Sequence, residues 1–337
     1  MAGLVVVLAL FFAFTNGFQD SSATVATMVA SRAASPRTGV LYSAVFGFLG
    51  AILGGSAVAF TVEGLVHVSS DALLVNILFS AVLSAASWNI ITWWLGLPSS
   101  STHALIGGLI GGGIAGAGLG SISWGWNELL AGQLTGLTKI LIFLAVSVGI
   151  GFLGGFAIKK ASMFVLRGSK RSVNRSIKRF QYITTAILSF FHGANDGQKQ
   201  MGIIVVVLLS AGAVTTQEIP IWVRVLCATA IGLGTIGGGW KIMKTLGRRI
   251  YAVKPIDSLD SQLTAAGTIM LSTAAGAPIS TTQVVASSIM GVGAAERVKL
   301  VQWSVGRHMA TSWLLTIPAS AVLSAVVFNI LNVILNI

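Results

Sequence analysis

The polar stretch NGFQD at residues 16–20 and the similar stretch HGAND at residues 192–196 stand inside strongly apolar sequence. A second pair of similar stretches follows, GLPSSSTH at residues 96–103 and GAPISTTQ at residues 276–283. Both pairs occur in the same order, one copy in each half of the chain. This repetition predicts a duplicated fold with polar groups at its centre.

The composition identifies the class of protein in which this duplication occurs. Of the 337 residues, 54% are hydrophobic and 9% are charged, and the mean hydropathy is +0.87. Such a chain cannot cover itself with a water-facing surface, so we expect an integral membrane protein. Residues 40–62, 139–158, 219–240 and 303–337 are long enough to cross a bilayer as helices, and membrane-spanning strands would be shorter and alternate in polarity.

The net charge of +12 would suggest nucleic-acid binding in a soluble protein. In this chain the positions of the charges are more informative than their sum. Most basic residues lie in a few blocks, at residues 32–37, 159–179, 241–254 and 297–299. Four of the acidic residues, Glu63, Asp71, Glu128 and Glu218, lie in segments almost without Lys or Arg. This is the positive-inside pattern of membrane topology. Basic and aromatic residues do not alternate, so no nucleic-acid partner is expected.

Placing the basic blocks in the cytoplasm gives a consistent path. The first half crosses inward at residues 1–28 and outward at 40–62, enters as a hairpin from outside at 72–118, and crosses inward at 139–158. The second half crosses outward at 182–213 and inward at 219–240, enters as a hairpin from the cytoplasm at 261–294, and ends outside after 303–337. Pro318 is a candidate break in the last segment.

We therefore predict an all-α polytopic protein of the cytoplasmic membrane, built from two inverted-topology repeats with broken helices and two re-entrant hairpins tipped by Ser and Thr. Repeat 1 covers residues 1–158, a basic cytoplasmic linker covers 159–180, and repeat 2 covers 181–337. Both termini are expected outside and the linker inside. Such folds bind substrate near the midplane, where the repeats meet. We expect helices to break at the glycines inside these stretches, Gly17, Gly96, Gly193 and Gly276, and to expose backbone groups to a ligand there.

Asp20 and Asp196 are the two carboxylates inside the predicted spans. An uncompensated carboxylate in the hydrocarbon costs several kcal/mol. A protonated or helix-paired aspartate could serve packing alone, but equivalent places in two repeats favour a shared central site. With the neighbouring Gln19 and Asn195, their oxygens suit Na⁺, and a proton is equally compatible.

Each hairpin tip carries hydroxyl residues after a proline, namely Ser99, Ser100, Ser101 and Thr102 in the first and Ser280, Thr281 and Thr282 in the second. Helix capping alone is one explanation. The free backbone N–H groups of a helix start also bind anions, and two facing starts would hold a tetrahedral oxyanion. Beside it, ionised aspartates would hold cations, or neutral ones would donate a proton. A site for an anion and a cation together describes a symporter.

Other polar residues near these stretches are secondary candidates. His192 and His103 could handle protons, although a buried histidine is more often structural. Lys199 lies three residues after Asp196 on nearly the same helix face, where it could pair with a carboxylate or attract the anion. The amides of Asn16 and Gln283 complete this set.

The sequence resembles the inorganic phosphate transporters of the PiT type. Residues 192–199, reading HGANDGQK, are similar to the family's second signature, and residues 16–20 resemble its first. Residues 96–103 and 278–282 resemble its two hairpin tips, and WLLTIPAS at residues 313–320 resembles its closing helix. The resemblance covers nearly the whole chain, with several motifs in the right order.

The resemblance implies symport of inorganic phosphate with Na⁺ or H⁺, in some bacterial members as a neutral metal–phosphate complex, without a resident cofactor. Asp20 and Asp196 would be the aspartates for the coupling ion and substrate, with Gln19 and Asn195 beside them. The phosphate-binding set would be Ser100, Ser101, Thr102, Gly193, Ser280, Thr281 and Thr282. Lipid is the other expected partner, with a homodimer as the candidate assembly.

Two departures from the family pattern are visible. Proton-coupled bacterial members often carry histidine where this chain has Gln19 and Gln283, which puts proton coupling at those positions in doubt. The long hydrophilic insert of many members is here a short basic loop.

Other functions compete with this interpretation. Sulfate is the main rival substrate, because any tetrahedral oxyanion fits the same donors. However, protonated phosphate can donate to Asp20 or Asp196, whereas sulfate has no proton at neutral pH. An anion channel would need a continuous pore. A membrane enzyme is disfavoured because no nucleophile–base pair occurs, and the single Cys227 excludes a cysteine-rich metal site.

Overall fold

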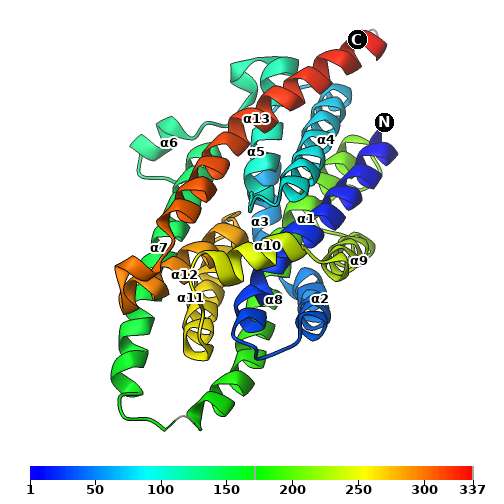
Figure 1. Ribbon diagram of the computed structural model, residues 1–337. Helices are drawn as coiled ribbons and strands as arrows, with labels where there is room; N and C mark the ends of the chain where they lie inside the picture. Colours follow the sequence, from blue (N-terminus) through cyan, green and yellow to red (C-terminus); the bar gives the residue numbers. More distant parts are fainter. Residues whose placement is uncertain (171, 336–337) are drawn as a thin grey trace.

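The computed structural model of the chain describes residues 1–170 and 172–335 and is built of helices joined by short connections (Figure 1). Arg171 of the predicted basic block, Asn336 and Ile337 lie outside the described residues. In the described part, β structure is limited to an isolated bridge between Val66 and Ile122. The all-helical prediction is therefore confirmed for these residues.

The first half of the chain contains seven α-helices within residues 1–170. They are α1 (Ala2–Ala30), α2 (Pro36–Leu53), α3 (Ala57–Glu63), α4 (Asp71–Leu95), α5 (Ser101–Ala117), α6 (Trp126–Leu130) and α7 (Gly136–Val165). Among the residues described in the second half are α8 (Val173–Ser210), α9 (Ile221–Gly237), α10 (Trp240–Lys244), α11 (Pro255–Ala274), α12 (Thr281–Glu296) and α13 (Trp303–Leu335).

Five of the described helices, α1, α2, α4, α7 and α13, are long and apolar enough to cross a membrane. Helix α9 and the helical segment Trp240–Arg249, which includes α10 and meets α9 at a bend of 62°, would together make a sixth. The 38-residue α8 is not in this group because it starts in the basic segment and carries polar residues along its middle.

Two predictions about helix continuity are wrong. The predicted span 40–62 is two helices, α2 and α3, and the amide of Gln198 bridges their junction by accepting from Val58 N at 2.8 Å and donating to Gly54 O at 2.7 Å. Conversely, α13 continues through Pro318. Transmembrane helices tolerate an internal proline where neighbouring groups satisfy the freed backbone.

The helices that carry the polar stretches are also continuous. Both α1 and α8 run unbroken through Gly17 and Gly193, so the prediction of broken helices at these glycines is wrong. The chain instead reverses between α4 and α5 and between α11 and α12. A glycine with positive φ ends the first helix of each reversal, Gly96 at 69° and Gly276 at 63°. The two Ser/Thr tips are thus tips of helical hairpins.

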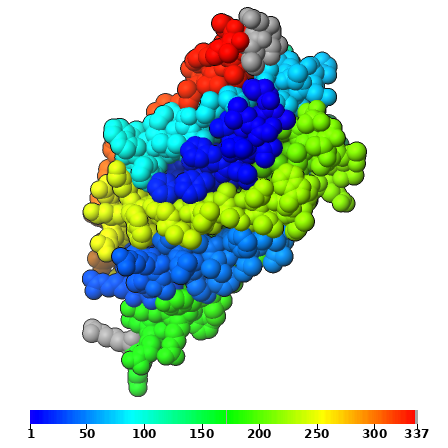
Figure 2. Space-filling model, turned by 90° about the vertical axis from the view of Figure 1, so that its right-hand side faces the viewer, coloured from blue at the N-terminus to red at the C-terminus, as the bar shows by residue number. Residues whose placement is uncertain are grey.

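The two halves interlock. Helices α1 and α8 cross antiparallel, because Ser31 bonds to Gln181 near one end and Ser21 bonds to His192 further along, both at 2.9 Å. Each hairpin packs on a helix of the other half, with α5 against α13 and α12 against α7. Figure 1 shows the start of α1 and the C-terminal part of α13 at the top, and the end of α7 and the start of α8 at the bottom. Figure 2 shows the start of α1 at the surface, beside helices α4 and α9 from both halves.

A polar layer lies between two apolar clusters along α1 and α8. One cluster includes Phe12 from α1 and Ile203 from α8, and the other includes Val25 from α1 and Leu188 from α8. The middle parts of both helices, between these residues, carry mostly buried polar side chains. The polar groups therefore sit midway along the two crossing helices rather than at either end of the molecule.

A second polar cluster lies where α7, α11 and α12 meet. Lys159 pairs with Asp257 and lies 3.5 Å from Glu296 Oε2, and its side chain is 4% exposed. The Tyr251 hydroxyl lies 2.7 Å from Glu296 Oε2 and 3.2 Å from Asp257 Oδ2, so its single proton is shared between the two carboxylates, and Lys254 pairs with Glu296. Burial opposes ionisation of Glu296, but the bonds from Lys254 and Tyr251 and the nearby lysines lower its pKa to about 2. Burial and the two carboxylates raise the pKa of Tyr251.

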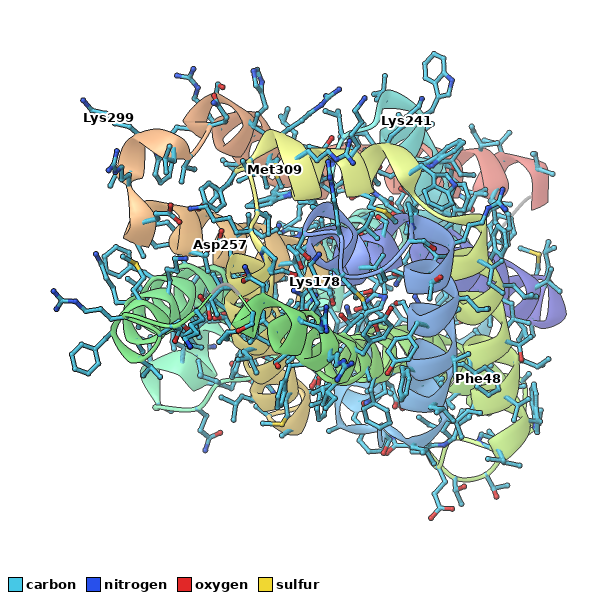
Figure 3. The ribbon with its side chains drawn as sticks, turned by 60° about the horizontal axis from the view of Figure 1, so that its bottom comes forward. Phe48, Lys178, Lys241, Asp257, Lys299 and Met309 are labelled. Atoms are coloured by element: carbon cyan, nitrogen blue, oxygen red, sulfur yellow. The ribbon has the colours of Figure 1, made fainter. Side chains whose placement is uncertain are left out.

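Part of the predicted linker belongs to this buried cluster, and most of the linker is helical. Helix α7 extends to Val165 and α8 begins at Val173, so most of residues 159–180 is helix. Lys159 is buried, whereas Lys299 from another basic block extends away from the helices (Figure 3). The labelled Asp257 in Figure 3 marks the position of the buried cluster.

We expect Lys159→Met to lower the free energy of unfolding by about 3–5 kcal/mol, because it leaves Asp257 buried without its cation. Lys160→Met is the matched control, since Lys160 is exposed and its ammonium lies only over the Phe156 ring, at 5.5 Å. The measurement is denaturant-induced unfolding in detergent. Equal midpoints for the two variants would contradict a structural role for the Lys159 pair.

Candidate functional site

The second helix of each hairpin starts with the same cap. Ser100 Oγ accepts from His103 N at 3.1 Å, and Ser280 Oγ accepts from Gln283 N at 3.4 Å. These two serines therefore act as N-caps, the alternative considered from the sequence. The hydroxyl residues that follow them are free to bond elsewhere.

The carboxylate of Asp20 joins the two hairpins to α1. Its oxygens accept from Ser101 Oγ at 2.5 Å and from Thr282 Oγ1 at 2.9 Å. Ser101 is in the first turn of α5 and Thr282 in the first turn of α12. The anionic group thus lies beside two helix starts, where exposed N–H groups and the helix dipoles favour negative charge.

The carboxylate of Asp196 is held by residues of its own helix. Lys199 Nζ lies 2.5 Å from Asp196 Oδ1, and His192 Nδ1 lies 3.3 Å from Oδ2. Lys199 also donates to Thr102 Oγ1 at 2.6 Å and to the Ile279 carbonyl at 2.8 Å. Through Lys199, Asp196 is connected to both hairpin tips as well.

An amide lies between the two carboxylates. The hydrogen-bonding surroundings of Asn16 orient its nitrogen toward Asp196 Oδ2, at 3.1 Å, and Asp20 Oδ2, at 3.3 Å, while its oxygen accepts from Gln200 at 3.1 Å. Asp20 is 3% exposed and Asp196 1%. The structure therefore brings the two predicted aspartates into one buried site.

The histidines belong to the same region. His192 bonds to Ser21 on α1 at 2.9 Å and to Thr281 on α12 at 3.1 Å. His103 lies 3.2 Å from Gln283, so this pair links the starts of α5 and α12. Both histidines contact residues of the opposite half of the chain.

Gln19 and Asn195 hold one hairpin each. Gln19 Nε2 donates to Thr92 of α4 at 3.1 Å. Asn195 Nδ2 donates to the Ala277 carbonyl at 3.1 Å and to Thr273 at 3.0 Å, and Asn195 Oδ1 accepts from Ile279 N. These amides therefore hold the hairpins in place beside the carboxylates.

Two predicted site residues make packing contacts away from the two carboxylates. Ser99 bonds to Trp88 and Thr316, at the contact with α13. Gly193 faces α2, where the Gly47 carbonyl occupies the space that a side chain would need. Their roles in phosphate binding stay predictions, and the contacts observed for both are packing contacts.

Sequence reasoning missed several polar residues of the region. Asn89 on α4 donates to Thr15 on α1 at 3.3 Å, and Gln200 reaches Asn16 from α8. The oxygens Gln19 Oε1 and Asn89 Oδ1 are buried, and no donor among the described residues reaches them. The sequence did indicate both residues, because Asn89 is a polar residue inside an apolar span and Gln200 lies one helical turn after Asp196.

The model of the Phosphate transporter family matches residues 16–174 and 164–324. The chain belongs to the phosphate transporter family. A probable low-affinity inorganic phosphate transporter of Bacillus subtilis is 40% identical over 336 residues, covering 98% of this chain and 97% of the relative. One of the same description from Rhizobium meliloti is 37% identical, with 97% and 95% covered.

The fold of this family member also matches a solved structure. The structure described as "The sodium-dependent phosphate transporter" has a TM-score of 0.88 and 27% identity, with 99% of each chain covered. These relatives are transporters rather than enzymes, and the apolar helices agree with a multi-pass membrane protein. The resemblance inferred from the polar stretches is confirmed.

We expect Gly193→Ala to destabilise the transporter by about 1–3 kcal/mol, because the new methyl group would overlap the Gly47 carbonyl and force α2 and α8 apart. Gly149→Ala on α7 is the control, since its methyl group would meet no atom within 4 Å. Thermal unfolding in detergent measures both. A Gly193→Ala variant as stable as Gly149→Ala would show that this crossing tolerates separation.

Proposed function

We propose that the protein is a symporter that moves inorganic phosphate across the cytoplasmic membrane together with Na⁺ or H⁺. The observation that carries the proposal is the convergence of the starts of α5 and α12 on Asp20, beside Lys199 and Asp196. Groups that bind anions and groups that bind cations meet in one buried polar layer.

The phosphate would bind where the hairpin tips meet. Helix starts, hydroxyl donors and the Lys199 ammonium all favour an oxyanion. The candidate ligands are Ser101, Thr102, Thr281 and Thr282. Because the carboxylate of Asp20 already accepts from Ser101 and Thr282, phosphate would compete with it for these donors. A protonated phosphate oxygen can in turn donate to a carboxylate, which favours phosphate over sulfate.

A mobile cation would bind on the α1 side of this site. Asp20 supplies negative charge there, and Gln19 Oε1 and Asn89 Oδ1 are buried acceptors without a donor among the described residues. Such oxygens can be satisfied by Na⁺, for which carboxylate and amide oxygens are suitable ligands. The sodium dependence named for the solved relative supports Na⁺ as the coupling ion.

Transport would proceed by alternating access between two inverted repeats, residues 1–158 and 181–337. The antiparallel crossing of α1 and α8 and the exchange of hairpins between the halves support this symmetry. In this arrangement the hairpins are re-entrant, both termini lie outside, and the α7–α8 connection lies in the cytoplasm. A homodimer and transport of a metal–phosphate complex stay predictions.

Reconstituted protein tests the function directly. We expect labelled phosphate to enter proteoliposomes under an inward Na⁺ gradient or an inward proton gradient, with little inhibition by excess sulfate. Uptake that neither gradient drives, or that sulfate inhibits as strongly as unlabelled phosphate, would overturn the proposal.

We expect Thr282→Val to raise the KM for phosphate uptake by about tenfold or more. The variant loses one hydrogen bond to the phosphate, and a hydrogen bond to a charged group contributes about 1.5–3 kcal/mol. Thr229→Val is the control: Thr229 is exposed and bonds only within its own helix, to the Val225 carbonyl. The measurement is initial uptake rate against phosphate concentration. Equal KM values for the two variants would exclude Thr282 as a phosphate ligand.

A further inference from the structure

The ammonium of Lys199 is enclosed by oxygen atoms. It donates to Asp196 Oδ1 at 2.5 Å, Thr102 Oγ1 at 2.6 Å and the Ile279 carbonyl at 2.8 Å. An ammonium has three hydrogens, and all three have acceptors here. The residue is 1% exposed, so it is one of the largest fully buried side chains of the protein.

The oxygen atoms around Lys199 are those that a hard monovalent metal ion uses. They comprise one carboxylate, one hydroxyl and one backbone carbonyl from an unwound segment between two helices. In transporters with interrupted helices, such carbonyls coordinate the transported cation. Lys199 therefore carries the charge of Na⁺ and contacts oxygens of the kind that would bind Na⁺.

The first half of the chain has no corresponding lysine. The residue three positions after Asp20 is Ala23, which is fully buried and has no charge. The donors to Asp20 are the hydroxyls of Ser101 and Thr282 and the amide of Asn16. The two carboxylates thus differ in charge compensation, since Asp196 has the ammonium of Lys199 on its own helix and Asp20 has no lysine at the corresponding position.

We propose that Lys199 is a tethered cation that permanently occupies the cation position of the second half, so that a mobile cation is exchanged only around Asp20. This inference rests on the proposed symport. Two carboxylates and one ammonium leave one negative charge before phosphate binds. Replacing a mobile ion by Lys199 lowers by one the number of cations that must accompany each phosphate.

The tether also explains which elements Lys199 joins. Thr102 starts the return helix of the first hairpin, and Ile279 lies in the tip of the second. A mobile ion would release these groups when it dissociates. Lys199 stays attached to α8, so the hairpins can separate from it without loss of a cation to either side of the membrane.

Removing the ammonium tests the proposal. We expect Lys199→Ala to bind Na⁺ in the exposed oxygen set. The unfolding temperature of this variant in detergent, without phosphate, should rise with NaCl when choline chloride keeps the ionic strength constant, and rise more than that of the wild type. In proteoliposomes the uptake rate of the variant should depend more steeply on Na⁺, with a Hill coefficient higher by about one.

Lys241→Ala is the matched control, because Lys241 is exposed and its ammonium donates to the Trp94 carbonyl near the first hairpin tip. Its response to Na⁺ should equal that of the wild type. Lys199→Gln, whose side chain is one atom shorter, polar and uncharged, provides a second variant and should also gain a Na⁺ response.

Three results would overturn the tethered cation. These are a Na⁺ response of Lys199→Ala equal to that of the wild type, loss of phosphate binding that Na⁺ does not restore, and failure of both Lys199 variants to fold in high NaCl. The second result would make Lys199 a phosphate ligand. Failure of the proposed symport is recognised separately, because it would abolish phosphate uptake by the wild type while leaving the Na⁺ response in detergent measurable.

Discussion

The structure depends on the need to satisfy two carboxylates inside an apolar helical bundle. Asp20 and Asp196 lie on α1 and α8 and are 3% and 1% exposed, so their charge has to be compensated by groups of the protein or by a bound ligand. Their partners come from segments far apart in sequence, namely the starts of α5 and α12 and the tip between α11 and α12. The hairpins therefore end where the carboxylates lie, and the packing of α5 on α13 and of α12 on α7 supports them there.

The same bonds constrain any movement of the hairpins. Ser101 donates to Asp20 Oδ2 and Thr282 donates to Oδ1, so displacing one tip removes the hydroxyl donor of one oxygen while the other oxygen stays bonded to the other tip. A buried acceptor left without a partner costs about 1–3 kcal/mol, and more when it is charged. A ligand with several oxygens and at least one proton can replace these bonds as a set. In the proposed alternating-access mechanism, ligand binding would therefore be coupled to movement of the hairpin tips.

The sequence predicts the class, the polar centre and the hairpin tips because each depends on local composition. It does not predict the continuity of α1 and α8, since a glycine such as Gly17 looks the same whether it breaks a helix or admits a neighbouring backbone. Here the Ile231 carbonyl lies against Gly17, and this contact comes from α9. Lys159 was assigned to the linker for a similar reason. Its partner Asp257 is 98 residues away, and only the tertiary fold brings the two together.

Duplication alone would give two equivalent halves with one carboxylate each, and equivalent sites would bind equivalent ions. The two stretches differ at several corresponding positions, and Ala23 and Lys199 form the pair that differs in formal charge. The difference of one charge falls in the layer where substrate and ions are proposed to meet. Because charges in a low-dielectric interior interact strongly, a single fixed cation there changes the ionic composition that the whole site requires. In this way, one change of side chain can give the two similar halves of a fold different ion requirements, while the backbone stays the same.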